Sequence, residues 1–205
     1  MRTAIVLAGG RSARFGGDKL AQRLDGEALV ERAIDAVAGV ADEVIVAGRA
    51  IEGQKRTVRA IADSEPFGGP LVALVGALGA AGGTFAIVVG GDMPGLVPAV
   101  LRTMLEQLEA APEIGALILA APEVPIGTDP PEPPRRQVLP LALRVQPAAR
   151  AAREAVGAGR RSLHALLDRM AVVELSLTIW RPLDPAARTL LDVDTPADLE
   201  RIRSG

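Results

Sequence analysis

The chain has 205 residues, 49% of them hydrophobic, and a formal net charge of −2, which suits one folded domain and argues against disorder of the whole chain. Cysteine is absent and histidine occurs once, so disulfides, thiolate metal sites, a cysteine nucleophile and a multi-histidine metal centre are excluded. The balanced charge and the 2% of aromatic residues supply neither the cationic surface nor the stacking side chains that nucleic-acid binding needs.

Apolar runs of strand length recur along the chain and alternate with stretches of helical periodicity. Strands are predicted at residues 4–8, 43–47, 85–90, 116–121, 139–145 and 172–177. The first four runs are almost wholly apolar, as expected of strands that are covered on both faces. Helices are predicted at residues 27–38, 71–81 and 98–111. The first helix places one apolar stripe on a single face: Val30, Ala33, Ile34 and Val37.

This alternation predicts a single α/β domain with a twisted, mostly parallel sheet, helices on both faces and right-handed crossovers. No domain boundary is visible within residues 1–205, but a first half of about 1–115 precedes a more irregular half of about 116–205. Residues 121–136 hold six prolines and are expected to form a long exposed loop. No apolar run reaches the roughly 18 residues of a membrane span. We therefore expect a soluble cytoplasmic protein with no membrane partner.

The first predicted strand runs into a glycine-rich turn, "LAGGRSARFGGDK", at residues 7–19. Four residues at its start should present backbone N–H groups to a ligand: Leu7, Ala8, Gly9 and Gly10. Open α/β sheets bind ligands at this carboxyl end of their strands. With Arg11, Arg14 and Lys19, the N–H groups predict an anion site that suits a triphosphate. The spacing matches neither the P-loop nor the G-x-G-x-x-G pattern.

Among the cations of this turn, Lys19 is expected to contact the phosphates most directly, because a compact ammonium can follow a developing negative charge. Arg14 ranks second for the triphosphate. Asp92 follows the apolar run at residues 85–90, so its carboxylate should lie at the ligand face of the sheet. Beside a triphosphate, its expected task is to hold Mg²⁺, a hard cation that takes oxygen ligands.

Asp192 and Asp194 alternate with apolar residues, so both carboxylates should share one face of an extended strand. Two carboxylates so close repel each other, and a bound cation would relieve the repulsion. The same stretch also predicts a helix start, with Thr195 as N-cap, Pro196 at the first helical position and Asp198 at the third. A capping role and a second metal or phosphate contact both stay open here.

Residues 7–19 match L-A-G-G-x-S-x-R-[MF]-G-x-D-K, which resembles the signature loop of nucleotidyltransferases that activate sugars, isoprenoid precursors and pterin cofactors. The "LAGG" form most resembles the molybdenum cofactor guanylyltransferase family. Four further segments resemble that family: "DSEPFGGPLVALVGAL" (63–78), "VVGGDMPGL" (88–96), "GAGRRSLHALL" (157–167) and "LLDVDTPADLERI" (190–202). The matches span most of the chain, whereas the proline-rich stretch and residues 176–189 carry little resemblance.

The resemblance implies a Rossmann-like nucleotidyltransferase fold and transfer of GMP from GTP to molybdopterin that carries molybdenum, with Mg²⁺ as cofactor and pyrophosphate as product. It implies that Asp92 holds the metal and that Asp63, Gly69 and Pro70 bind the nucleotide. It also implies a nucleotide-binding half of about 1–115 and an acceptor-binding half of about 116–205. Lys19, Asp92 and Arg14 form the expected catalytic set. Expected partners are GTP, the molybdopterin-type acceptor and, transiently, proteins that deliver the molybdenum cofactor. We expect a monomer or a weak oligomer.

Two departures from the family pattern leave alternatives open. The guanylyltransferases usually carry asparagines where this chain has Asp192 and Asp194, and aspartates occur there in related cytidylyltransferases. CTP, or another phosphorylated acceptor, therefore stays an alternative. The family often has a nucleotide-contacting asparagine where this chain has Ala47, which would suit a non-catalytic nucleotide-binding relative. Retention of Lys19 together with Asp92 argues against that relative. A sugar-phosphate nucleotidyltransferase fits less well, because such chains are generally longer.

The second half holds four arginines that either clamp the terminal phosphate of the acceptor or lie in solvent: Arg135, Arg136, Arg160 and Arg161. His164 is expected to be a helix residue rather than a catalyst. Trp180 is expected in the core or at its rim rather than stacked on a ligand.

Overall fold

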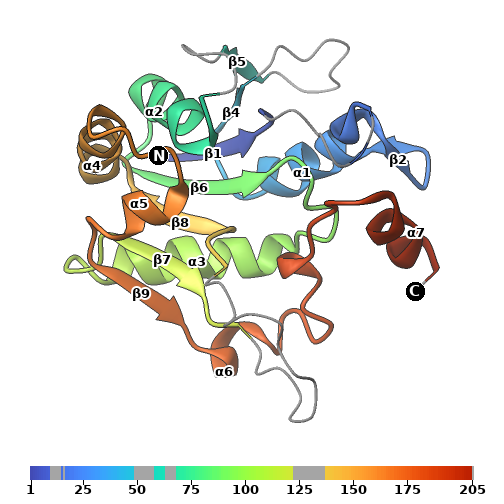
Figure 1. Ribbon diagram of the computed structural model, residues 1–205. Helices are drawn as coiled ribbons and strands as arrows, with labels where there is room; N and C mark the ends of the chain where they lie inside the picture. The colour runs from blue at the N-terminus through green and yellow to red at the C-terminus, as the bar shows by residue number, and fades with distance from the viewer. Residues whose placement is uncertain (10–14, 16, 49–57, 63–67, 122–136, 205) are drawn as a thin grey trace, which may run out of the picture.

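The computed structural model describes residues 1–9, 15, 17–48, 58–62, 68–121 and 137–204. Its centre is a seven-stranded sheet in the order β5-β4-β1-β6-β8-β7-β9 (Figure 1). The strands are β1 (Arg2–Leu7), β4 (Glu43–Ala47), β5 (Arg59–Ile61), β6 (Phe85–Gly90), β7 (Ala116–Leu119), β8 (Leu141–Arg144) and β9 (Val172–Leu175). Within this sheet, β8 alone is antiparallel to its two neighbours, β6 and β7. The predicted α/β class and mostly parallel sheet are confirmed.

Helices cover both faces of this sheet. One face packs against α1 (Leu29–Ala38) and α3 (Pro98–Ala110), and the other against α2 (Pro70–Ala80), α4 (Val145–Gly157) and α5 (Leu163–Leu167). Strand residues divide between the two cores in the alternating pattern that a pleated strand imposes. In β1, Ala4 and Val6 face the α1/α3 core, while Ile5 faces the α2/α4 core.

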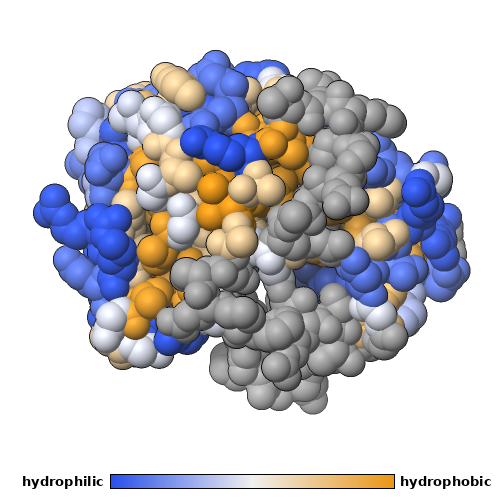
Figure 2. All heavy atoms as spheres, turned by 90° about the horizontal axis from the view of Figure 1, so that it is seen from above, coloured by the Kyte–Doolittle hydropathy of each residue, from blue (hydrophilic) through white to orange (hydrophobic). Residues whose placement is uncertain are grey.

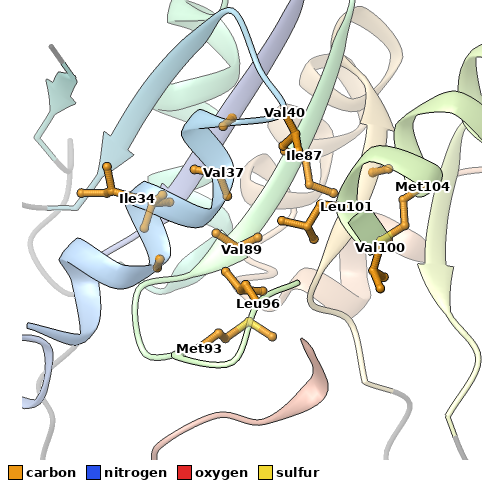
Figure 3. Packing of buried hydrophobic residues seen from close by; sticks show 14 of the residues in the cluster. Ile34, Val37, Val40, Ile87, Val89, Met93, Leu96, Val100, Leu101 and Met104 are labelled. Carbon is orange, nitrogen blue, oxygen red and sulfur yellow. The ribbon is translucent and has the colours of Figure 1, made fainter. Parts of the chain in front are cut away.

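The predicted stripe of α1 is buried in the first of these cores. Figure 3 shows Val37 of α1 and Leu101 of α3 on either side of Val89 of β6, and Ile34 of α1 belongs to the same core. Each fully buried side chain of this size contributes roughly 1.5–3 kcal/mol. The loop that follows β6 is anchored in the same core by Met93, which is 2% exposed.

The structure differs from the prediction in its short and alanine-rich elements. Residues 27–28 form β3 (Glu27–Ala28), which pairs with β2 (Arg23–Leu24), so α1 begins two residues later than expected. β5 and α4 were not predicted. β5 has three residues and is half exposed, and α4 packs through alanines, whose small side chains give a weak periodic signal.

α2 is apolar around its whole circumference, since its sequence PLVALVGALGA holds no charged residue. Its inner side packs on β4 and β1 and its flank on α4. Figure 2 shows apolar side chains gathered near the middle of the face seen from above, on the side where Figure 1 places α2. Among the described residues, no helix is long and apolar enough to cross a membrane.

The end of the chain returns to its beginning. α7 (Pro196–Ser204) follows two short elements, α6 (Leu177–Trp180) and η2 (Arg188–Leu190). Leu199 of α7 joins Val193, Leu24 and Leu29 in a small separate core. The last residues of the second half (about 116–205) thus pack against the first half (about 1–115), and the expected nucleotide-binding and acceptor-binding roles of these halves stay predictions.

Candidate functional site

The turn after β1 is held from both sides. Ala8 donates its backbone N–H to the Ala47 carbonyl oxygen at 2.8 Å, and Gly91 donates to the Leu7 carbonyl oxygen at 2.9 Å. Gly9 fits closely against Gly48, where φ is +104° and where an added Cβ would lie 2.6 Å from the Gly9 Cα. The chain therefore leaves β1 along a fixed path between the ends of β4 and β6.

Lys19 begins the 3₁₀ turn η1 (Lys19–Ala21), and this position is set by Asp18. The Asp18 side chain caps the turn by accepting from the Leu20 N–H at 3.1 Å. The Lys19 Nζ lies 2.6 Å from Asp92 Oδ2 and 3.1 Å from Asp194 Oδ1. Only 13% of the Lys19 side chain is exposed. Burial by itself lowers the pKa of Lys19, but hydrogen bonds and charges from both carboxylates outweigh it and raise that pKa.

Asp92 stands just after β6, where the strand backbone ends. Gly90 leaves room for the Asp92 carboxylate, which an added Cβ would displace. The Val193 N–H donates to the Asp92 carbonyl oxygen at 3.0 Å, which ties the segment before α7 to this strand end. Asp92 is thus held by β6 on one side and by the returning chain on the other.

Asp192 and Asp194 flank the buried Val193 in an extended segment. This segment does not pair with a β-strand, so the expected strand does not form. The expected alternation of a buried apolar residue between two aspartates that face outward is present. Partial burial of the Asp192 carboxyl, followed by the charges of Asp194 and Asp92, raises the pKa of Asp192. The predicted helix start is confirmed. Thr195 caps α7, with its Oγ1 3.2 Å from the Asp198 backbone N, and the Asp198 carboxylate accepts from the Thr195 N–H at 2.7 Å.

Beside these carboxylates lies a pocket of about 470 Å³. Its walls come from the start of α2, the turn after β6, the residues before β8 and the start of α5. Its polar lining is Asp92, Gln137, Ser162, His164 and Asp192. The Gln137 amide is oriented by its Nε2, which donates to the Leu190 carbonyl oxygen at 2.7 Å.

Gly69 precedes the pocket residue Pro70 and packs against the backbone of Arg161. Its φ is +94°, and an added Cβ would lie 3.1 Å from the Arg161 carbonyl oxygen. The same oxygen accepts from the Leu71 N–H at 3.2 Å, in the first turn of α2. The backbone of Arg161, rather than a side chain, therefore caps α2. Glycine is required at position 69 by this close packing, and the predicted approach of a base to Gly69 and Pro70 stays a prediction.

A protein-family model described as the MobA-like NTP transferase domain matches residues 4–173, most of the chain. The chain belongs to this family. A probable molybdenum cofactor guanylyltransferase from Chloroflexus aggregans is 33% identical over 208 residues, which covers 100% of this chain and 94% of that protein. A molybdenum cofactor guanylyltransferase from Desulfosudis oleivorans is 28% identical over 201 residues, 97% of this chain and 93% of that one.

Solved structures agree with this membership. Molybdopterin-guanine dinucleotide biosynthesis protein A from Archaeoglobus fulgidus superposes with a TM-score of 0.77 at 25% identity, covering 100% of this chain and 97% of that chain. 2-C-methyl-D-erythritol 4-phosphate cytidylyltransferase from Thermus thermophilus has a TM-score of 0.68 at 20% identity, covering 98% and 96%, and this likeness shows the shared fold. The predicted resemblance is confirmed, and the chain is a MobA-like nucleotidyltransferase.

Several predicted site residues lie outside the described part of the chain: Gly10, Arg11, Arg14, Asp63, Arg135 and Arg136. Most of the proline-rich stretch lies there too. Of the others, Lys19, Asp92 and Asp194 meet directly, and Asp192 lies beside them. As expected, Trp180 is fully buried, and it donates its Nε1–H to the Ala120 carbonyl oxygen at 3.2 Å. His164 is an exposed residue of the short helix α5, as expected, and it lines the pocket, so its lack of a catalytic role stays a prediction.

Two further arginines of the second half stand at the surface. Arg160 is exposed and lies 3.9 Å from the Asp168 carboxylate. Arg161 is exposed as well, although its backbone caps α2. Sequence reasoning missed Gln137 and Ser162 as pocket residues. Neither residue carries a local signal, because each reaches the pocket only through the path of the folded chain.

The carboxylates fit a metal that arrives with a nucleotide. In the described ranges no cluster of three or more acidic, histidine or cysteine side chains is arranged to hold a metal alone. Asp92 and Asp194 converge on one ammonium and offer two oxygen ligands. Mg²⁺ usually takes one or two protein carboxylates and completes its shell with phosphate oxygens and water.

Proposed function

We propose that this nucleotidyltransferase transfers GMP from GTP to molybdopterin that carries molybdenum, giving the guanine dinucleotide cofactor and pyrophosphate. The observation that carries the proposal is the meeting of Lys19, Asp92 and Asp194 at the strand ends where the "LAGG" turn begins. The names of the relatives that cover nearly the whole chain support this choice of substrates.

In the proposed reaction, an oxygen of the acceptor phosphate forms a bond to the α-phosphorus of GTP. The bond from that phosphorus to the bridging oxygen breaks in line, and pyrophosphate leaves with the electron pair. The attacking phosphate is already anionic, so no general base is needed. This requirement suits a chain with one histidine, and His164 stays outside the chemistry.

The protein contributes positioning and charge neutralisation. The N–H groups of the "LAGG" turn and the Lys19 ammonium would bind the triphosphate and hold its α-phosphorus in place. Asp92, with Asp194 or Asp192, would hold Mg²⁺, which when bound neutralises charge on the phosphates. β1 and β6 fix the backbone that carries these groups before the nucleotide arrives, so only side chains would need to rearrange.

The acceptor belongs in the pocket beside Asp92 in this proposal. Its volume of about 470 Å³ falls within the range of small-molecule sites. Most of its polar lining comes from the second half, where Gln137, Ser162 and Asp192 stand. An acceptor held there would direct its phosphate toward Asp92, where the nucleotide's α-phosphate is expected.

A second candidate is the same transfer with CTP. Asp192 and Asp194 favour it, since aspartates at these positions resemble the related cytidylyltransferases. The two candidates share the phosphate and metal chemistry and differ in the base that is bound.

Calorimetric titration of GTP and CTP in Mg²⁺ tests the proposal. A GTP affinity at least about tenfold above that of CTP, a difference near 1.4 kcal/mol, is the expected result. Release of pyrophosphate from GTP on addition of the molybdopterin acceptor should follow. A preference for CTP would make CTP the proposed nucleotide substrate in place of GTP. Binding of GTP with no pyrophosphate release would instead indicate a non-catalytic nucleotide-binding protein.

A further inference from the structure

We propose that Lys19 is a resident cation of the metal site. Its ammonium takes the place of the metal between Asp92 and Asp194 while no nucleotide is bound, and it excludes free divalent cations from these carboxylates. The exclusion ends when a metal arrives on a nucleotide, whose phosphates give the ammonium new partners. The inference rests on the proposed metal-dependent transfer, but it does not depend on which base is bound.

The geometry is that of a cation shared by two anions. The Lys19 Nζ lies within hydrogen-bond distance of both carboxylates, at 2.6 Å from Asp92 and 3.1 Å from Asp194. The backbones of Asp92 and Asp194 are held together without the ammonium, because the Val193 N–H donates to the Asp92 carbonyl oxygen at 3.0 Å and Thr195 caps α7. The two carboxylates therefore stay near each other whether or not the ammonium lies between them.

Charge balance favours an ammonium at this position. The Asp92 and Asp194 carboxylates both lie within hydrogen-bond distance of the Lys19 Nζ, so two negative charges face one positive charge. Two carboxylates that converge on one point attract a cation. With the ammonium removed, the same oxygens would be open to a divalent metal.

Only the end of the lysine side chain needs to move for the exchange. Asp18 fixes the backbone of Lys19 in η1, while the carboxylates contact only the Nζ. The flexible four-carbon stem of lysine lets the charge shift over several ångströms without moving the backbone. The metal would take the carboxylates and the ammonium would take the phosphates, so neither cation is left without a partner. Metal and nucleotide would thus bind as one unit.

Binding of Mn²⁺ alone, followed by electron paramagnetic resonance without nucleotide, tests this role. Wild type should bind Mn²⁺ weakly, and Lys19→Met should bind it at least about tenfold more tightly, because the competing charge is gone. Lys19→Arg keeps the charge and should stay close to wild type. Arg153→Met removes one positive charge from an exposed position of α4, far from the site in Figure 1, and controls for net charge.

The double variant Lys19→Met with Asp194→Asn locates the effect, since it should lose the Mn²⁺ affinity that Lys19→Met gained. Thermal unfolding provides a second readout, in which Mn²⁺ should raise the Tm of Lys19→Met more than that of wild type. Should Lys19→Met not fold, Lys19→Gln is measured in its place with the same expectation.

Equal Mn²⁺ affinity in wild type and the neutral Lys19 variant would overturn the inference. An increase in Mn²⁺ affinity of the same size in Arg153→Met would also overturn it. Neither result touches the proposed function, which fails only if nucleotides do not bind or no pyrophosphate is released. Conversely, a preference for CTP would change the proposed substrate and leave the Mn²⁺ result intact.

Discussion

Val193 donates its backbone N–H to the carbonyl oxygen of Asp92 at 3.0 Å, which joins the segment before α7 to the end of β6. Because Val193 is fully buried, the two aspartates on either side of it are turned outward toward Lys19 and the pocket. This single backbone contact builds one cluster from carboxylates that are far apart in the chain.

Asp92→Asn should abolish metal-dependent nucleotidyl transfer, with a loss of at least about a hundredfold in kcat, because an amide is a poor ligand for Mg²⁺. The fold should persist, since Val193 bonds to the backbone of Asp92 rather than to its side chain. Pyrophosphate release and circular dichroism measure the two quantities. Asp168→Asn, at an exposed position beside Arg160, is the control and should keep full activity. Turnover at the wild-type rate in Asp92→Asn would show that this carboxylate holds no essential metal.

Asp192→Asn should raise the Tm at neutral pH. Burial of the carboxyl and the charges of Asp194 and Asp92 raise the pKa of Asp192, so its ionisation favours the unfolded chain as pH rises through that pKa. The variant's advantage should be a degree or two at about pH 7 and should vanish below about pH 4, where aspartate is protonated in both states.

Asp198→Asn provides a matched variant of opposite sign. Hydrogen bonds from the Thr195 side chain and backbone lower the pKa of Asp198, so its charge stabilises the fold above the usual aspartate range. This variant should lower the Tm at neutral pH and approach wild type in acid. Thermal unfolding in Mg²⁺-free buffer between about pH 2 and pH 8 measures both variants, because both effects disappear only below the usual aspartate range. A Tm shift of the same sign in both variants would contradict the claim that the charges of Asp192 and Asp198 have opposite effects on stability.

Gly48→Ala should destabilise the fold by about 2 kcal/mol or more and weaken nucleotide binding. The position combines a φ of +104° with the close approach of Gly9, so a methyl group would push the "LAGG" turn away from β4. Gly79→Ala on α2 is the matched control, because its Cβ would meet nothing within 4 Å. It should stabilise the helix by roughly 0.5–1 kcal/mol. Urea unfolding compares the two, and equal effects would refute the packing argument.

Arg144→Met should cost about 2–3 kcal/mol of unfolding free energy. The guanidinium donates to the carbonyl oxygens of Leu108 at 2.8 Å, Ala111 at 3.0 Å and Ile114 at 2.9 Å, which satisfies the end of α3 and the turn after it. It also lies over the Phe85 ring, with 5.0 Å between the guanidinium carbon and the ring centroid. Arg150→Met, at an exposed position of α4, should change stability by less than about 0.5 kcal/mol. Urea unfolding of both variants checks the difference.

The sequence by itself determined the elements whose signal is local. β1, β4 and β6 are continuous apolar runs, and α1 carries a stripe at helical spacing, so each could be located from neighbours along the chain. The start of α7 was equally local, because Thr195, Pro196 and Asp198 form their cap within a few residues. The "LAGG" turn and Asp92 also follow directly from strands that were predicted, and this is why both fall at the expected end of the sheet.

Only the tertiary structure decided which of these residues meet. Lys19 and Asp194 are 175 positions apart, and nothing local to either one encodes their contact. Their meeting depends on the reversed β8, on α4 and on the return of the chain to the β6 end, none of which has a strong local pattern. Gln137 reaches the pocket in the same way. Local periodicity reports how a segment faces its own core, whereas a site built from distant segments depends on strand order and on the chain's path.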